Sequence, residues 1–92
     1  MPAAAPKVLS IVIPAYNEER FIGTLLGQIA AVDLEPLGVR KEVIVVDDHS
    51  ADRTSAIAAG FEGVRLRRLE RNSGKGRAVR EGISLATGDY LI

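Results

Sequence analysis

Two adjacent carboxylates, Asp47 and Asp48, directly follow the run Val43-Ile44-Val45-Val46, and packing alone does not account for them. A carboxylate at the end of a buried strand can accept a hydrogen bond from a base N–H or a ribose hydroxyl, and it can help to hold a metal ion. Adjacent strand residues point to opposite faces, so the two acids need not share one role. We interpret both as residues of a binding site.

A second loop follows the first apolar run and combines a rigid proline, an aromatic ring and a carboxylate. Pro14, Tyr16 and Glu18 could together hold a planar base and a sugar hydroxyl. The alternative is a turn that leads into a helix capped by Asn17, which would explain Pro14 and Glu18 without any ligand.

The third loop runs from Arg71 to Arg77 and places Lys75 between two glycines. Its spacing matches neither the Walker phosphate loop nor the three-glycine dinucleotide pattern. Backbone N–H groups at the start of the following helix could still attract a phosphate, with Lys75 assisting. The glycines could equally serve only the turn.

The composition excludes several other kinds of site. The chain of 92 residues has no cysteine, which excludes disulfides and thiolate metal sites, and its single histidine excludes a histidine-cluster metal site. We expect that histidine, His49, to be an exposed turn residue rather than a catalyst. The formal net charge of zero gives no reason to expect nucleic acid as a partner. No apolar run approaches the roughly 20 residues that a membrane span needs.

The neutral total hides an asymmetry between the two parts of the chain. Residues 1–52 hold four basic and eight acidic side chains, a net of −4, whereas residues 53–92 hold eight basic and four acidic ones, a net of +4. The basic part is either a solvated face of a strand and a helix or a positive rim for a phosphorylated ligand or an anionic surface.

The apolar pattern predicts strands over residues 8–13, 42–47 and 64–69, and the beginning of a fourth strand at residue 90. Helices are expected from residue 17, from about residue 50, and over 75–87, with a loop over 33–40. The alternation predicts an α/β fold, a parallel sheet with helices on both faces in a Rossmann-like arrangement. The third strand should lie near an edge. Such sheets bind ligands at the carboxyl ends of their strands, where all three loops fall.

Local signals add further expectations. Pro14 should end the first strand, Asn17 should cap the first helix with Glu18 and Glu19 in its first turn, and Ser50 or Asp52 should cap the second. A glycine inside a helix lowers its stability relative to alanine, so a close approach of the helix to the sheet would explain the presence of Gly82. The residues expected to face inward are Phe21, Ile22, Leu25, Leu26 and Ile29 in the first helix and Ala78, Val79, Gly82, Ile83 and Ala86 in the third.

Together the three loops resemble glycosyltransferase family 2, whose members are inverting enzymes with a GT-A-type nucleotide-sugar fold. The resemblance covers residues 8–92 and is closest to the branch of dolichol- and undecaprenyl-phosphate sugar transferases. The matching segments are Val12-Ile13-Pro14-Ala15-Tyr16-Asn17-Glu18-Glu19, Glu42 to Asp48 with Ser50, Asp52 and Thr54, and Asn72-x-Gly74-Lys75-Gly76-x-Ala78 followed by Gly82, Ala86 and Gly88-Asp89-Tyr90.

The resemblance implies a role for each matching residue. Pro14, Tyr16 and Glu18 would line the pocket for the base and ribose of the nucleotide. Asp48 would accept a hydrogen bond from the base, while Asp47 would support the loop. Lys75 and the start of the third helix would lie near the base or the phosphates. Two positions depart from the family, which usually has glycine where this chain has His49, and often where it has Arg53.

The resemblance also implies what residues 8–92 lack. We expect residues 1–7 to be a flexible tail and residues 8–92 to be the incomplete nucleotide-binding front of a transferase domain, truncated at the start of its fourth strand. The acidic motif that binds Mg²⁺ or Mn²⁺ is expected after Ile92, as is the catalytic base, so no catalytic or metal residue is assigned. The fragment would then be inactive alone.

The whole enzyme would move a sugar from a nucleoside diphosphate sugar to an acceptor, either a polyprenyl phosphate or a glycan, in the cytoplasm or at the cytoplasmic face of a membrane. Exposed sheet edges would favour self-association of the fragment. Two alternatives remain from the residues: a stand-alone nucleotide-binding or regulatory α/β module without transferase activity, and a structural remnant that binds nothing.

Overall fold

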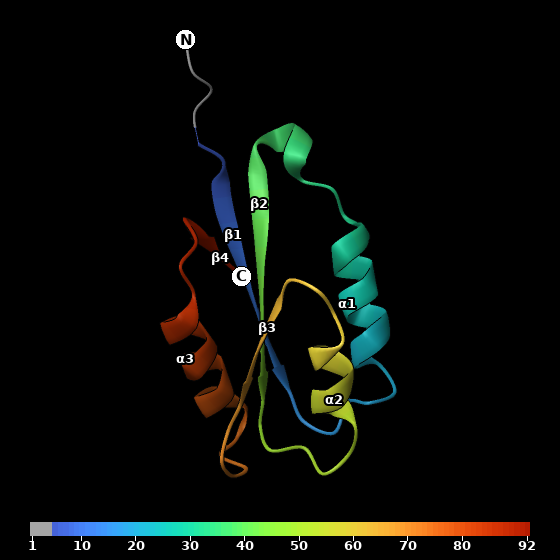
Figure 1. The fold of residues 1–92 in the computed structure, drawn as a ribbon. Helices are drawn as coiled ribbons and strands as arrows, with labels where there is room; N and C mark the ends of the chain where they lie inside the picture. The colour runs from blue at the N-terminus through green and yellow to red at the C-terminus, as the bar shows by residue number, and fades with distance from the viewer. Residues whose placement is uncertain (1–4) are drawn as a thin grey trace.

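The computed structural model describes residues 5–92 and contains one parallel sheet with the strand order β3-β2-β1-β4. Its strands are β1 (Lys7–Ala15), β2 (Val39–Asp47), β3 (Val64–Arg68) and β4 (Tyr90–Leu91). The helices are α1 (Ile22–Ala31), a short 3₁₀ helix η1 (Glu35–Leu37), α2 (Thr54–Ala59) and α3 (Lys75–Leu85). The alternation of strands and helices confirms the predicted α/β fold, and β3 lies at an edge as expected (Figure 1).

Two boundaries at the amino end of the sheet differ from the prediction. Residues 1–4 of the expected tail lie outside the described residues, and β1 already begins at Lys7, whose N–H donates to Gly38 O at 2.9 Å. Strand β2 begins at Val39, inside the segment expected to be a loop, because Lys7 to Leu9 of β1 pair with residues 39–41. The longer pairing extends the sheet away from the site.

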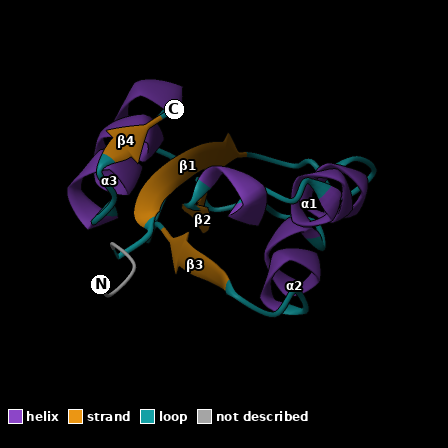
Figure 2. Ribbon diagram, turned by 90° about the horizontal axis from the view of Figure 1, so that it is seen from above, coloured by secondary structure: helices purple, strands orange, loops and turns teal. Residues whose placement is uncertain are grey.

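The helices cover both faces of the sheet, with α1 and α2 on one face and α3 on the other (Figure 2). Strand β2 lies between them, and its Ile44, Val45 and Val46 are fully buried. Val45 packs with Ile22, Leu26 and Ala58 beneath α1 and α2, while Ile44 and Val46 pack with Ala78 beneath α3. A central strand covered on both faces needs apolar side chains at consecutive positions, which is why the run is unbroken.

The prediction that Pro14 ends the first strand is wrong, because β1 continues to Ala15 and pairs with β2 through Pro14–Val46 and Ala15–Asp47. The N–H of Val12 points toward β4 and donates to Ile92 O at 3.0 Å. The nitrogen of Pro14, two residues further, faces the same side, whereas the hydrogen bonds on the β2 side involve alternate residues such as Lys7 and Ala15. The proline therefore costs no hydrogen bond in the ladder with β2.

Helix α1 starts later and buries less than predicted. It begins at Ile22, so Asn17 does not cap it, and its first turn holds no acidic residue. Ile22 and Leu26 are buried, but Phe21 is 64% exposed and Leu25 is 40% exposed, contrary to the expected inward face. The helix is short and contacts the sheet and α2 along a narrow stripe, so the flanking apolar positions stay outside.

Helix α3 approaches the sheet most closely at Gly82, as predicted. A Cβ atom at this position would lie 2.3 Å from Val12 Cγ1 and 3.2 Å from Val46 Cγ2. Only glycine fits between the helix and the sheet here. Contrary to the expected inward orientation, Ile83 is 46% exposed. The helix ends at Leu85, and both Leu85 and Ala86 pack against the core.

A polar cluster fixes the amino end of β4 to the other strands. The carboxylate of Glu42 accepts hydrogen bonds from the Thr87 N–H at 2.8 Å, the Ser10 hydroxyl at 2.7 Å and the Thr87 hydroxyl at 2.7 Å. Arg65 adds an ion pair at 3.3 Å. The Thr87 N–H, the Ser10 and Thr87 hydroxyls and the Arg65 charge together lower the pKa of Glu42 from 4.5 to about 2. The cluster therefore holds a permanent carboxylate.

Among the helices of the described residues, none combines the length and the apolar character that a membrane crossing requires.

Candidate functional site

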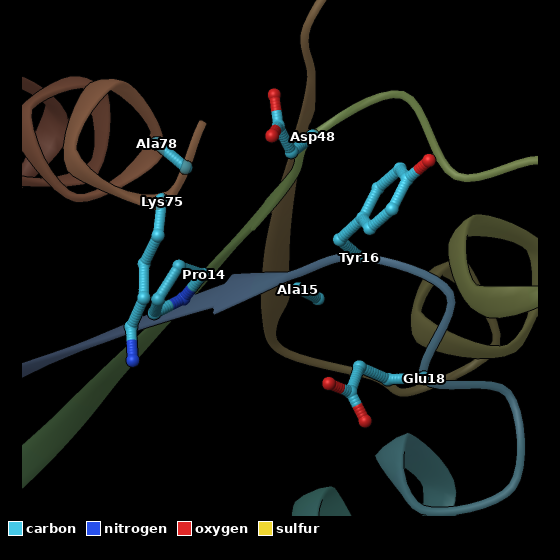
Figure 3. A pocket seen from close by; sticks show the side chains of 7 residues that line it. All are labelled: Pro14, Ala15, Tyr16, Glu18, Asp48, Lys75 and Ala78. Carbon is cyan, nitrogen blue, oxygen red and sulfur yellow. The ribbon is translucent and has the colours of Figure 1, made fainter. Parts of the chain in front are cut away.

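Three loops meet at the carboxyl end of the sheet, one each after β1, β2 and β3 (Figure 1). They and the start of α3 enclose a pocket of about 150 Å³. Figure 3 shows residues from β1 and its loop, from the end of β2 and from α3 around this pocket. The lining residues are Pro14, Ala15, Tyr16, Glu18, Asp48, Lys75 and Ala78. Five of the six predicted binding residues thus lie together, and Asp47 does not line the pocket.

Asp48 joins the end of β2 to the start of α3. It is only 4% exposed, and its two carboxylate oxygens accept the backbone N–H groups of Ser73, at 2.7 Å, and Gly74, at 2.9 Å. A negative charge is favourable at the N-terminus of a helix. Gly74 has a φ of 92°, which a residue with a Cβ atom rarely adopts, so this glycine serves the turn. Each carboxylate oxygen keeps a second lone pair for a ligand N–H.

The start of α3 is the place where the third loop would bind a phosphate, if it binds one. A phosphate at this position would meet the carboxylate of Asp48, which already accepts the N–H groups of Ser73 and Gly74. Like charges at this distance oppose each other strongly. The N–H groups of Ser73 and Gly74 thus serve the fold, and Lys75 is the basic residue among those that line the pocket.

Asp47 supports the loop from the interior. Its side chain is fully buried, and its Oδ1 accepts the N–H of Ser50 at 3.2 Å and also the Ser50 hydroxyl. Its Oδ2 accepts no hydrogen bond within residues 5–92 and lies 3.7 Å from Nε of Arg68, which supplies the counter-charge. Arg68 also donates from Nη2 to Ser50 O at 2.9 Å. The two adjacent acids thus have different roles, as their alternation in the strand predicts.

The loop that carries Tyr16 is hydrogen-bonded to the loop after β2. The N–H of Asn17 donates to Ser50 Oγ at 2.8 Å, and Asn17 Oδ1 accepts the N–H of Ala51 at 2.9 Å. Asn17 adopts a left-handed φ of 51°, which asparagine tolerates better than most residues. It therefore connects two loops instead of capping α1. Its ability to adopt this conformation is the sequence signal that could have indicated this role.

Glu18 and Glu19 are held in the same way, not in the first turn of α1. Their N–H groups donate to Thr54 Oγ1 at 2.8 Å and to Asp52 Oδ2 at 3.2 Å. Asp52 Oδ1 accepts the N–H of Thr54, the first residue of α2, at 2.9 Å. The predicted cap is nevertheless wrong, because α2 begins at Thr54 and not near residue 50, and its cap position is Arg53 and not Ser50 or Asp52. Partial burial would raise the pKa of Asp52, but hydrogen bonds from Thr54 and Glu19 lower it.

The two departures from the family pattern are both accommodated. His49 is exposed, adopts a left-handed φ of 62°, and its Nδ1 lies 3.1 Å from Leu69 O. This is the conformation that a glycine would adopt without cost, so the loop keeps its shape with histidine. Arg53 has an ordinary φ of −88°, and glycine is not required there.

A metal site would need several His, Cys, Asp or Glu side chains close together. Residues 5–92 contain no group of three or more such side chains that could hold a metal ion.

Comparisons of the sequence with known proteins agree with this geometry. The family model for glycosyl transferase family 2 matches residues 10–92. The human dolichyl-phosphate beta-glucosyltransferase is 39% identical over 97 residues, which cover 94% of this chain and 30% of that protein. The undecaprenyl-phosphate 4-deoxy-4-formamido-L-arabinose transferase of Aeromonas hydrophila is 38% identical over 91 residues, 94% of this chain and 28% of that protein. The chain thus spans about 30% of the length of these relatives.

Solved structures share the fold. S. aureus TarS superposes with a TM-score of 0.79 at 29% identity, over 91% of this chain and 26% of that one. The mannosyltransferase PcManGT from Pyrobaculum calidifontis, solved with GDP-Man and Mn²⁺, gives a TM-score of 0.76 at 28% identity, over 96% of this chain and 26% of that one. Both likenesses cover nearly all of this chain and support its GT-A-type sheet arrangement.

Proposed function

The chain belongs to glycosyl transferase family 2, and from this premise we propose that residues 8–92 bind the nucleotide of a nucleoside diphosphate sugar for an inverting transferase. The observation that carries the proposal is the pocket between the three loops, called the nucleotide pocket from here on. Side chains from three loops, far apart in the sequence, meet at the carboxyl end of a parallel sheet, where α/β folds of this kind bind ligands. The pocket volume of about 150 Å³ suits part of a ligand, such as a planar base.

Each lining residue has a chemical role in this proposal. Tyr16 and Pro14 offer flat apolar surfaces to the base, and the second lone pairs of Asp48 accept a base N–H. Glu18 accepts a ribose hydroxyl; its own N–H is already bonded to Thr54, which fixes the backbone beneath it. Lys75 interacts with base oxygens or with the phosphates. Asp47 contributes through the loop that it holds.

The proposal for the whole enzyme extends to its acceptor and its metal ion. Two relatives are named as dolichyl- and undecaprenyl-phosphate sugar transferases, so we take a polyprenyl phosphate as the acceptor, with a glycan as the alternative. An acceptor phosphate is already ionised and needs little help from a base. Mg²⁺ or Mn²⁺ would offset the charge of the leaving diphosphate. Residues 5–92 do not present a fitting ligand set, so we assign them no step that involves the metal.

Isothermal titration calorimetry of the 92-residue chain with UDP and GDP, with and without Mn²⁺, tests the binding. We expect saturable binding of one of the two nucleotides, weakened about tenfold or more by Tyr16→Ala and by Lys75→Gln. Glu62→Gln is the control, because Glu62 is exposed and lies outside the pocket. No binding of either nucleotide by the folded chain would contradict the proposal.

Transfer by the same chain separates binding from catalysis. We propose that these residues carry the nucleotide-binding part of the reaction and do not transfer sugar by themselves, since they span about 30% of their relatives. An assay with a nucleoside diphosphate sugar, Mn²⁺ and a polyprenyl phosphate in detergent should give no product above the background. Robust transfer would show that the chain is a complete catalyst.

We propose that the protein works at the cytoplasmic face of a membrane, where it would reach a lipid-linked acceptor.

We also propose that the chain self-associates through the β4 edge. Tyr90, Leu91 and Ile92 are 55%, 46% and 71% exposed at this edge. The opposite edge, β3, carries Arg65 and Arg67, whose charges discourage strand pairing. Sedimentation velocity should show a concentration-dependent dimer that Leu91→Lys weakens, and a strictly monomeric chain would contradict this.

A further inference from the structure

A second concavity, the arginine groove, lies between the end of β3, the loop after it and α3 (Figure 1). Its volume is about 730 Å³, and Leu69 is the single apolar residue among those that line it. The lining residues are Arg67, Arg68, Leu69, Glu70, Arg71, Ser73, Arg77 and Glu81. Four arginines and two glutamates give this lining a net charge of +2, so the groove suits a hydrated anion and not an apolar ligand.

Two of the four arginines are already engaged. Arg67 forms an ion pair with Glu81 at 3.2 Å. Arg68 points toward the loop after β2, where it donates to Ser50 O and lies 3.7 Å from the Asp47 carboxylate. Their positive charges are therefore largely balanced within the fold.

Arg71 and Arg77 are different, because both are exposed and neither forms an ion pair with any residue of 5–92. Arg71 lies in the loop after β3 and Arg77 lies in the first turn of α3, so two free guanidinium groups border one groove. Glu70 is the remaining acid that could oppose an anion there. A pair of free guanidinium groups matches the oxygens of a phosphate, which arginine binds through two parallel N–H bonds.

The groove is separate from the nucleotide pocket, since the two share no lining residue. They are divided by a common wall, in which Asp48 on the pocket side accepts the N–H of Ser73 on the groove side at 2.7 Å. The N–H groups of Ser73 and Gly74, just before α3, are already accepted by Asp48. The charge that holds an anion in the groove must therefore come from the arginines.

We propose that the arginine groove binds a phosphate-bearing anion through Arg71 and Arg77, at a site distinct from the nucleotide pocket. Two sources can supply this chemistry: a soluble anion such as pyrophosphate, and the phosphate head groups of an anionic lipid surface. The groove volume of about 730 Å³ leaves room for either a pyrophosphate or a lipid head group.

The test uses the 92-residue chain, two probes and a charge-matched control. Pyrophosphate is titrated while backbone amide shifts are followed by NMR, and sedimentation is measured with vesicles of phosphatidylcholine, with and without phosphatidylglycerol. The groove variant is Arg71→Gln/Arg77→Gln. The control is Arg20→Gln/Arg40→Gln, which removes the same charge from exposed positions outside the groove. Thermal melts confirm that both variants fold.

We expect the amides of Arg71, Ser73 and Arg77 to shift with pyrophosphate, or the chain to sediment only with vesicles that contain phosphatidylglycerol. The first result identifies a soluble anion as the source, and the second identifies a lipid head group. In either case the groove variant should bind about tenfold more weakly and the control less than twofold, while Glu70→Gln should bind more tightly.

Three outcomes would overturn the proposal. The first is an absence of binding to both probes. The second is an equal loss in the groove variant and the control, because general electrostatic attraction would then suffice. The third is pyrophosphate shifts confined to Tyr16, Asp48 and Lys75, because the anion would then occupy the nucleotide pocket. The result with nucleotides does not enter this test, so the two proposals can fail independently.

Discussion

The carboxylate of Asp48 lies 2.9 Å from the backbone nitrogen of Gly74, so the side chain that follows β2 also fixes the start of α3. The same side chain lines the pocket between the three loops. This carboxylate serves the fold through two backbone N–H groups, and in the proposed function its remaining lone pairs accept a base N–H. Its two functions can be separated by substitution.

Asp48→Asn should weaken nucleotide binding about tenfold or more while costing less than about 1 kcal/mol of unfolding free energy. Asparagine still accepts one backbone N–H at the helix start, but its NH₂ group cannot accept a base N–H. Asp48→Ala should lose nucleotide binding and also about 1–2 kcal/mol, because both N–H groups lose their partner. Calorimetry and urea unfolding measure the two effects. Wild-type affinity in Asp48→Asn would exclude a direct contact between Asp48 and the base.

Gly82→Ala should destabilise the protein by about 2–3 kcal/mol, even though alanine favours helices. The new Cβ would lie 2.3 Å from Val12 Cγ1 in the packed interior, so helix and sheet must move apart. Gly27→Ala is the matched control: Gly27 lies in α1, and a Cβ there meets nothing within 4 Å. It should stabilise by up to about 1 kcal/mol. Equal effects of the two substitutions in urea unfolding would contradict the close approach.

The parts of the fold that the sequence predicted share one property: a single local signal determines them. The unbroken run 43–46 indicates a strand buried on both faces, and a glycine inside a helix indicates a close approach, which the structure shows at Gly82. The two errors at Pro14 and Asn17 have the opposite cause. Their conformations depend on partners distant in the sequence, namely the pairing of β1 with β2 and the loop at Ser50 and Ala51.

The candidate site shows the same division. The residues that face the pocket lie at or just after the ends of β1 and β2 and in the first turn of α3, places that the strand pattern alone could locate. The hydrogen bonds that hold the loops could not, because Ser50, Asp52 and Thr54 match an ordinary helix cap equally well. They bond across 33 to 36 residues to the loop after β1. Contacts of that sequence separation depend on the register of β1 against β2, which no short motif encodes.

The Glu42 cluster predicts a specific loss of stability in acid. The pKa of Glu42 is about 2 in the folded chain and near 4.5 when its partners are gone. The carboxylate therefore stabilises the fold above about pH 4.5, and this contribution disappears as the pH falls toward 2. Glu42→Gln should cost roughly 1–2 kcal/mol at pH 7 and flatten the stability curve between these two pH values.

Glu62→Gln provides the control for this prediction, because Glu62 is exposed and forms no ion pair with any of residues 5–92. Its unfolding free energy should follow that of the wild type across the whole acid range. Urea unfolding at pH 7, 5, 4 and 3 measures the difference. A Glu42→Gln curve parallel to the wild type would show that Glu42 titrates normally in the folded protein.

Arg68→Met should destabilise the protein by about 1–2 kcal/mol, because it leaves the buried carboxylate of Asp47 without its counter-charge. The estimate is modest since the Arg68 side chain is 48% exposed and water screens the pair. The neighbouring Arg67→Met is the matched control: its ion pair with Glu81 lies at the surface, 56% and 21% exposed, and should contribute less than about 0.5 kcal/mol.

A double-mutant cycle shows whether Arg68 acts through Asp47. In the background of Asp47→Asn the buried charge beside Arg68 is gone, so Arg68→Met should then cost clearly less than it does in the wild type. The amides of Asn17 and Ser50 provide a second measurement, because both belong to the network that Asp47 anchors. Their hydrogen exchange should accelerate in Arg68→Met and stay unchanged in Arg67→Met. Additive losses in the cycle, together with unchanged exchange at both amides, would mean that Arg68 contributes to stability independently of the loop that presents Tyr16.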